Sequence, residues 1–246
     1  MSRESIKTVH GVRYKNGSVE TIEDQVIIED TFHLYLNGRK YQSLVASRDS
    51  LEELGAGFFI AAGLAQNILQ VRVEGDSIFV TAEEVCEKET ALESAGGIDT
   101  GVPDRKVVSG LSVTPEEIFV IRESLNSDVW DKTGGLHCTA LYHNGAVAGL
   151  FSDIGRHNTV DKAVGFMVLH HLNPAECIIG CTGRQPRGMV SKAVNSGIPV
   201  VISRAAATTA GIETAEAAGV TLVCFTRDRR FTVYTHPERI AGLSHP

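Results

Sequence analysis

The chain has 246 residues, of which 43% are hydrophobic and 22% are charged, a composition close to that of folded soluble proteins. Its formal net charge of −7 argues against a general nucleic-acid-binding protein, because that class is usually basic. No apolar run is long enough to span a membrane, and the N-terminus lacks the apolar segment of a secretory signal. We therefore expect a cytoplasmic globular protein with no nucleic-acid partner and no membrane contact.

The first third of the chain is rich in signals for β-hairpins. Asn16-Gly17 and Asn37-Gly38 are turn dipeptides with strand-forming runs on either side. The segments 71–73 and 77–80 alternate in the same way and are expected to form another hairpin. This part of the chain is therefore predicted to be mainly β-structure.

Helix signals and a loop follow. The run Ser50-Leu51-Glu52-Glu53 matches a capping box, so we expect a helix that begins at Ser50 and follows the apolar run to Leu69. Residues 94–103 lack periodicity and are rich in turn-forming residues, which predicts a loop. Thr114-Pro115-Glu116-Glu117 is typical of a capped helix start.

Strands and helices alternate in the second half of the chain. The expected strands are 136–143, 146–151, 177–180, 198–202, 220–225 and 231–235, and the expected helices are 159–171, 186–195 and 208–218. Such alternation is typical of helices packed on a largely parallel sheet, here with a last strand that returns antiparallel. The predicted fold is therefore α/β, with a three-layer core in residues 113–246 and a smaller β-rich α+β domain in residues 1–112.

Arginine side chains follow four of the predicted strands. In open α/β sheets, ligands bind at the carboxyl ends of strands, beside helix N-termini. These positions carry Asp153 with Arg156, Arg184 with Arg187, Arg204, and Arg227 with Arg229 and Arg230. Because the guanidinium group matches the geometry of phosphate, their recurrence on one side of the sheet predicts an anionic ligand with several phosphates.

A glycine pair, Gly134-Gly135, precedes His137 at the start of a predicted strand. Paired glycines allow a close approach of the backbone to a ligand. A tight turn, followed by a histidine whose partners lie within the protein, has the same sequence pattern. Both interpretations remain open.

Polar and charged residues are also concentrated between the strand predicted at 146–151 and the helix predicted at 159–171. Arg156 and Lys162 could hold a phosphate there, and Asn158 or Thr159 could cap the helix. The structural alternative is an ion pair between Asp153 and Arg156 that fixes the loop. Exposed ion pairs contribute little stability, which favours the ligand interpretation.

The chain has five cysteines, and so odd and sparse a count without a signal peptide is typical of reduced thiols; none lies in a C-x-x-C pair. Cys177, Cys181 and Cys224 fall in apolar strands, where inert thiols are expected. Cys138 directly follows a histidine, so the two side chains point to opposite faces of a strand, and Cys86 lies among acids that disfavour a thiolate. The zinc-deaminase signature is missing, so no metal site is predicted.

Taken together, several motifs resemble those of the formate dehydrogenase accessory sulfurtransferase family, and the similarity covers most of the chain. They are Thr133–His137, Asp153–Lys162 with its G-R-H-N-x-V-D-K run, Thr182–Arg184, Thr221–Phe225 and Tyr234–Ile240. The resemblance implies a cytidine-deaminase-like core without the deaminase zinc. It also implies a cytoplasmic homodimer that binds the bis(molybdopterin guanine dinucleotide) molybdenum cofactor. Sulfur would pass from a cysteine desulfurase to that cofactor, for the catalytic subunit of formate dehydrogenase.

The resemblance also assigns residues to the cofactor site. The family's cofactor-binding stretch falls on Phe225, Thr226, Arg227, Asp228, Arg229 and Arg230. Together with the strand-end clusters, the expected cofactor-binding set further includes Gly134, Gly135, His137, Asp153, Arg156, His157, Asn158, Gly183, Arg184, Arg187, Ser203 and Arg204. The arginines would hold phosphates, the glycines and His137 would shape the pocket, and the residues from Asp153 to Asn158 would order its wall.

One departure from the family pattern concerns its C-G-x-C-G loop, whose first cysteine carries the persulfide. Ala95 and Ile98 stand where the two cysteines are expected. Because a thiolate is the nucleophile in sulfur transfer, the catalytic residue is unassigned, with Cys138 and Cys86 as candidates. Three functions remain open: a sulfurtransferase that uses another cysteine, a non-catalytic cofactor carrier or chaperone, and a nucleotide-modifying enzyme on a deaminase-like fold.

Overall fold

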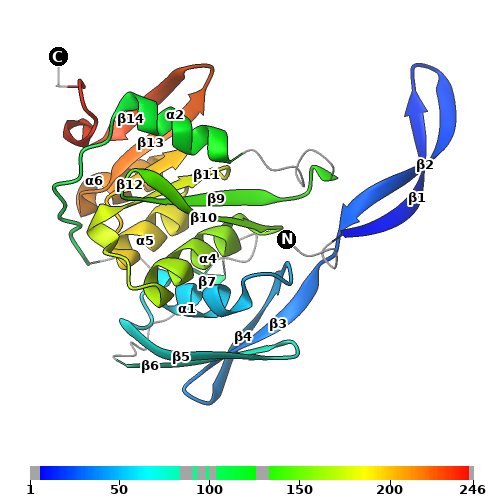
Figure 1. Ribbon diagram of the computed structural model, residues 1–246, viewed down its shortest axis with the longest axis horizontal. Coiled ribbons are helices and arrows are strands. Elements are labelled where there is room, and N and C mark those ends of the chain that lie inside the picture. Colours follow the sequence, from blue (N-terminus) through cyan, green and yellow to red (C-terminus); the bar gives the residue numbers. More distant parts are fainter. Residues whose placement is uncertain (1–5, 84–90, 93–97, 100–103, 126–132, 244–246) are drawn as a thin grey trace.

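A computed structural model describes residues 6–83, 91–92, 98–99, 104–125 and 133–243. Two sheets and the helices that pack on them make up the body of the molecule, and a long hairpin of β1 (Ile6–Lys15) and β2 (Ser18–Ile27) projects from it (Figure 1). The fold is thus of mixed α/β type. In the described part of the chain, no helix is long and apolar enough to cross a membrane.

The smaller sheet has four strands in the order β4-β3-β6-β5. They are β3 (Asp30–Leu36), β4 (Arg39–Ala46), β5 (Asn67–Glu74) and β6 (Ser77–Glu83). The β3–β4 hairpin turns at Asn37-Gly38, where both residues have positive φ, and β5 pairs antiparallel with β6. These two predicted hairpins are confirmed, as is the one predicted at Asn16-Gly17, where β1 pairs antiparallel with β2.

Helix α1 (Leu51–Ala61) covers one face of this sheet; it begins directly after Ser50, as predicted, but it lacks the predicted cap and ends earlier. Ser50 has a φ of 50° and its side chain makes no capping hydrogen bond, so the predicted capping box is wrong. The helix ends at Ala61, because the apolar run is divided between the helix and strand β5, which contains Leu69. A run of apolar residues alone does not distinguish a buried helix from a strand.

The larger sheet has six strands in the order β10-β9-β11-β12-β13-β14. They are β9 (His137–His143), β10 (Ala146–Asp153), β11 (Cys177–Cys181), β12 (Val200–Ser203), β13 (Thr221–Arg227) and β14 (Arg230–Thr235). Only β11–β12 and β12–β13 pair parallel, so the prediction of a largely parallel sheet is wrong. Short turns join β9 to β10 and β13 to β14, and short turns can only produce antiparallel neighbours.

Helices cover both faces of the larger sheet. Helix α2 (Pro115–Ser124) lies on one face, and α4 (Arg156–Leu169), α5 (Arg187–Ser196) and α6 (Thr209–Ala218) lie on the other. The predicted cap of α2 is confirmed, because Thr114 and Glu117 form a reciprocal capping box. Helix α4 begins at Arg156 after Gly155, so Asn158 and Thr159 lie inside the helix and do not cap it. Two short 3-10 turns (Pro174–Glu176 and Pro237–Arg239) and a two-stranded ladder of β7 (Ala91–Leu92) and β8 (Ile98–Asp99) complete the described elements.

Successive residues of the central strands enter two separate cores. Ile179 and Leu222 pack with the α4 side, whereas Ile178 and Val223 pack with the α2 side. Because both faces are covered, these strands are apolar along their whole length, which is why the sequence shows continuous apolar runs there.

A single hydrophobic cluster joins the small sheet to the large one through the contact between α1 and α4. Glycines make this contact close: a methyl group at Gly57 would overlap the backbone of Asp161, and one at Gly165 would overlap the backbone of Glu53. Helix backbones can approach this closely only where no Cβ intervenes. The boundary predicted between residues 112 and 113 stays a prediction.

Candidate functional site

Four strands of the large sheet end at the same edge. Strands β10, β11, β12 and β13 run in one direction, and β9 starts at this edge, where His137 pairs with Asp153. The edge therefore brings together the segments 133–137, 153–158, 182–187, 203–208 and 225–230, which we call the strand-end edge. These segments contain every residue that the sequence assigned to the cofactor site.

The assigned residues divide by exposure into three groups. Exposed at the strand-end edge are Gly134, Gly135, Arg184, Arg187, Arg227, Asp228, Arg229 and Arg230. Partly buried are His137, Arg156, Arg204 and Phe225, and buried are Asp153, His157, Asn158, Gly183, Ser203 and Thr226. Exposed side chains can contact a ligand, whereas the buried ones support the backbone below.

Asp153 is the centre of a buried hydrogen-bond network. Its Oδ1 accepts from the backbone N–H of Gly155 (2.9 Å) and from Nδ2 of Asn158 (2.8 Å). Its Oδ2 accepts from the backbone N–H of Ser47 (3.1 Å) and lies 2.7 Å from Nζ of Lys162. The buried ion pair of Asp153 is therefore with Lys162, on the same helix as Arg156 but inside the protein.

Lys162 has no exposed side-chain surface. Its ammonium group donates to Oδ1 of Asp49 (2.6 Å), to Oγ of Ser47 (3.0 Å) and to the carbonyl oxygen of Ser152 (3.1 Å). The expectation that Lys162 could hold a phosphate is wrong, because the ammonium is enclosed by its own protein partners. Sequence reasoning missed Ser47 and Asp49, and the Ser-x-Asp spacing before α1 gave no signal of this role.

Asn158 and the Lys162 network join the two sheets. Nδ2 of Asn158 also donates to the carbonyl oxygen of Val45 in β4 (2.9 Å). Residues from β10 and α4 are thus bound to the connection between β4 and α1. The segment that the sequence identified as a pocket wall is an internal clamp between the small sheet and the strand-end edge.

A second buried ion pair lies beside this clamp. Nζ of Lys192 on α5 is 2.6 Å from Oδ1 of Asp161 on α4, and both side chains are almost fully buried. Burial raises the pKa of Asp161, and the Lys192 ammonium opposes that rise. Burial, together with the charges of Lys192 and Arg156 and the neighbouring His137, lowers the pKa of His157 to about 2. His157 is therefore a neutral imidazole at neutral pH.

His137 lies at the start of β9 with a partner inside the protein. Its Nδ1 is 3.1 Å from Oγ1 of Thr182, and that hydroxyl also accepts from the backbone N–H of Cys138 (3.1 Å). Burial and the charge of Arg156 lower the pKa of His137, and Asp153 opposes this. The structural interpretation of this histidine is supported, and the imidazole still lies at the edge beside the exposed glycines.

The loop after β11 is supported from below. Oγ of Ser203 donates to the carbonyl oxygen of Gly183 (2.7 Å), and Nε2 of Gln185 donates to the same oxygen (2.8 Å). Gln185 is buried and was missed from the sequence. These bonds fix the backbone of the loop, while the side chain of Arg184 remains exposed.

The turn between β13 and β14 has an unusual backbone. Phe225, Asp228 and Arg229 all have positive φ, which is uncommon for residues other than glycine. At Asp228 and Arg229 the two-residue hairpin turn between the paired Arg227 and Arg230 requires it. The Arg229 guanidinium donates to Glu116 and lies 4.6 Å from the ring centre of Phe119 on α2. The structure thus directs Arg229 toward α2, because an exposed carboxylate and an aromatic face are available there.

The described cysteines are all buried. Burial raises the pKa of Cys177 to about 12 and that of Cys181 to about 11, and it also raises those of Cys138 and Cys224. Ile98 lies in β8, whereas the candidate positions Ala95 and Cys86 lie outside the described residues. Within the described residues, no three His, Cys, Asp or Glu side chains gather to hold a metal ion.

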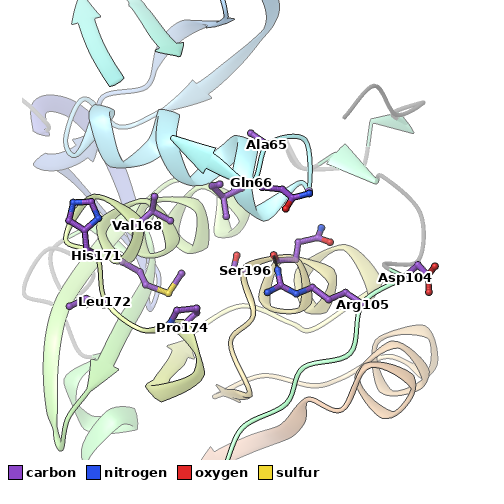
Figure 2. Close-up of a pocket in the computed structure, with 13 residues that line it drawn as sticks. Ala65, Gln66, Asp104, Arg105, Val168, His171, Leu172, Pro174 and Ser196 are labelled. Atoms are coloured by element: carbon purple, nitrogen blue, oxygen red, sulfur yellow. Dashed lines mark hydrogen bonds between the residues drawn. The ribbon is translucent and has the colours of Figure 1, made fainter. Parts of the chain in front are cut away.

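A cavity of about 620 Å³ lies at the other end of the helices (Figure 2). It is lined by residues near the C-terminal ends of α1, α4 and α5, among them Met167, His171 and Asn195, together with Arg105. None of the residues that the sequence assigned to the site lines this cavity. It is therefore separate from the strand-end edge.

Comparisons with known proteins agree with one another. The model of the FdhD/NarQ family matches residues 27–241. A protein named sulfur carrier protein FdhD from Bacillus licheniformis is 32% identical, over 93% of this chain and 94% of its own. One of the same name from Sulfolobus acidocaldarius is 31% identical, over 96% and 98%. A crystal structure described as that of a formate dehydrogenase accessory protein from Desulfotalea psychrophila aligns with a TM-score of 0.84 at 26% identity, over 96% of this chain and 99% of that one.

Neutral His157 makes the stability of the fold depend on pH. Its imidazole stays neutral in the folded chain, whereas in the unfolded chain it takes up a proton near pH 6.5, so stability is lost as the pH falls below that value. Between pH 7 and pH 5, the wild type is expected to lose about 2 kcal/mol more unfolding free energy than His157→Gln. Urea unfolding of both proteins at the two pH values measures this difference, and equal losses would contradict the buried neutral state.

Proposed function

This chain belongs to the FdhD/NarQ family, and from that premise we propose that it is a formate dehydrogenase accessory protein that carries the molybdenum cofactor as cargo. The cofactor, in its bis(molybdopterin guanine dinucleotide) form, would lie at the strand-end edge. The observation that carries this proposal is the row of exposed arginines along one edge of a sheet, at Arg184, Arg187, Arg227 and Arg230.

The donor set of the edge fits such a cargo. A guanine dinucleotide presents pyrophosphate groups, and guanidinium groups bind phosphate oxygens with two parallel hydrogen bonds. Gly134 has a φ of 61°, and no atom of the described residues lies within 4 Å of where its Cβ would be, so the backbone there is open to a close approach from that part of the molecule. Helices α5 and α6 also begin at this edge, where their N-termini favour anions.

The buried residues would act by positioning. Asp153 and Asn158 fix the loop that leads into α4, and Ser203 and Gln185 fix the loop that carries Arg184. Arg229 is engaged by Glu116 and would contribute least among the arginines of the last turn. Rigid support of this kind lowers the entropy lost when the exposed arginines bind a ligand.

The remaining expectations are part of the same proposal. The client would be the catalytic subunit of a formate dehydrogenase, with a cysteine desulfurase as a further partner, in the cytoplasm. The cytidine-deaminase-like character of the core stays a prediction, as does the absence of a resident zinc ion. The alternative of a nucleotide-modifying enzyme has no specific observation in its favour.

The cysteines favour a carrier over a sulfurtransferase. Sulfur transfer needs an accessible thiolate, and all four described thiols are buried with raised pKa values. The positions expected for the family's loop cysteines hold Ala95 and Ile98. We therefore propose a cofactor carrier that supports sulfuration without itself forming the persulfide.

Binding of the guanine nucleotide part tests the proposed site. Calorimetric titration with GDP should give saturable binding to the wild type. The variant Arg184→Ala with Arg227→Ala should bind at least about tenfold more weakly, because each lost arginine removes a charge-assisted hydrogen bond. The control Arg39→Ala with Arg72→Ala removes the same charge from the small sheet and should bind like the wild type. Absent GDP binding, or equal affinities in all three proteins, would contradict the proposal.

Mass spectrometry separates the carrier from the sulfurtransferase. After incubation with a cysteine desulfurase and cysteine, the intact mass of the chain should remain unchanged, because no described thiol is an accessible thiolate. An increase by the mass of one sulfur atom, reversed by a thiol reductant, would show a persulfide. That result would replace the carrier with a sulfurtransferase, and a Cys86→Ser variant would then show whether Cys86 holds the sulfur.

A further inference from the structure

Thr182, the residue that follows β11, is held against the start of β9 by its main chain and its side chain. Its backbone N–H donates to the carbonyl oxygen of Cys138 (3.0 Å). Its Oγ1 accepts from the backbone N–H of Cys138 and lies 3.1 Å from Nδ1 of His137. The hydroxyl is therefore placed with one donor and one imidazole nitrogen beside it.

A count of protons assigns the roles in this contact. A hydroxyl has one proton to donate, and a neutral imidazole carries a proton on one ring nitrogen while the other accepts. Among the described residues, Nδ1 of His137 is the only group in reach that can accept the proton of Thr182. If Nδ1 accepts it, the imidazole proton lies on Nε2. The opposite tautomer would point two N–H groups at Oγ1 and leave the hydroxyl proton without an acceptor in that part of the chain.

The groups around His137 keep its imidazole neutral at neutral pH. Burial and the charge of Arg156 on α4 lower the pKa of His137. Asp153, its pair partner on β10, opposes this fall, and His157 on α4 is itself neutral. The N–H on Nε2 is consequently a donor on an uncharged ring.

Nε2 of His137 is open at the strand-end edge. It makes no hydrogen bond with the described residues, and it is not one of their buried polar atoms that lack a partner, so solvent reaches it. Thr182 lies two residues before the exposed Arg184 on the same loop. A methyl group at Gly183 would lie 3.0 Å from Cβ of Arg156, so the start of α4 packs on this loop. The imidazole thus lies beside the two segments that carry Arg156 and Arg184.

We propose that Thr182 holds His137 in the Nε2–H tautomer, and that this N–H donates to a phosphate oxygen of the bound ligand. The inference rests on the proposed function, because it names the part of the cargo that His137 would contact. A phosphate is the acceptor that the surroundings favour, since the guanidinium of Arg184 projects from the loop that holds Thr182. Arg184 would supply the charge and His137 a directed hydrogen bond. Thr182 does not touch the ligand and is a positioning residue.

Nitrogen NMR of protein labelled at its histidines tests the tautomer without any ligand. The signal of His137 is identified among the nine histidines by its loss in His137→Gln. At neutral pH the wild type should carry the proton on Nε2 and none on Nδ1. Thr182→Val removes the hydroxyl at similar volume and should give a mixture of tautomers, whereas Thr182→Ser keeps the hydroxyl and should match the wild type.

Calorimetric titration with GDP and with inorganic pyrophosphate tests the contact. Thr182→Val should bind both about fivefold more weakly than the wild type, because one directed hydrogen bond is lost. Thr182→Ser should bind both like the wild type. A purely structural role of Thr182 would lower the stability of Thr182→Val without changing the tautomer of His137.

The two readouts separate this inference from the proposed function. A wild type that binds no GDP would contradict the proposed function. With GDP binding intact, a proton on Nδ1 in the wild type, an unchanged tautomer in Thr182→Val, or equal pyrophosphate affinities in Thr182→Val and the wild type would each overturn the inference alone. The tautomer of the wild type decides the first part even if Thr182→Val does not fold.

Discussion

A buried ammonium group, that of Lys162, joins the parts of this molecule that carry its candidate site. Burying a charge is costly unless partners replace its water shell, and here Asp49, Asp153, Ser47 and a backbone carbonyl do so. The partners come from the β4–α1 connection and from the end of β10. Their geometry fixes where α4 begins relative to the small sheet, and hence how the strand-end edge is formed.

The strand-end edge therefore has two layers with different roles. Below, buried polar groups such as Asp153 and Ser203 hold the loops, and above, exposed guanidinium groups such as that of Arg184 remain available for phosphates. This division suits a protein that holds a phosphate-bearing cargo without changing it.

Sequence reasoning predicted best what is decided locally. Asn-Gly turns, the Thr114 cap and the meeting of the strand ends depend on neighbouring residues or on simple sheet geometry. What it missed depends on distant partners: Lys162 meets Ser47 across 115 positions of the chain, and that contact changes a supposed phosphate ligand into an internal clamp. Similarly, the apolar run that ends at Leu69 divides between a helix and a strand, because tertiary packing and not periodicity decides where α1 stops.

The most direct test is the unfolding free energy of Lys162→Met. If the buried ammonium holds the edge to the small sheet, this variant should lose about 3–5 kcal/mol, because Asp153 is left buried without a counter-charge. The double variant Asp153→Asn with Lys162→Met should recover part of that loss, and Arg72→Met, which breaks an exposed ion pair with Glu74, should stay within about 0.5 kcal/mol of the wild type. A loss below about 1 kcal/mol for Lys162→Met, within the range of an exposed ion pair, would contradict the account.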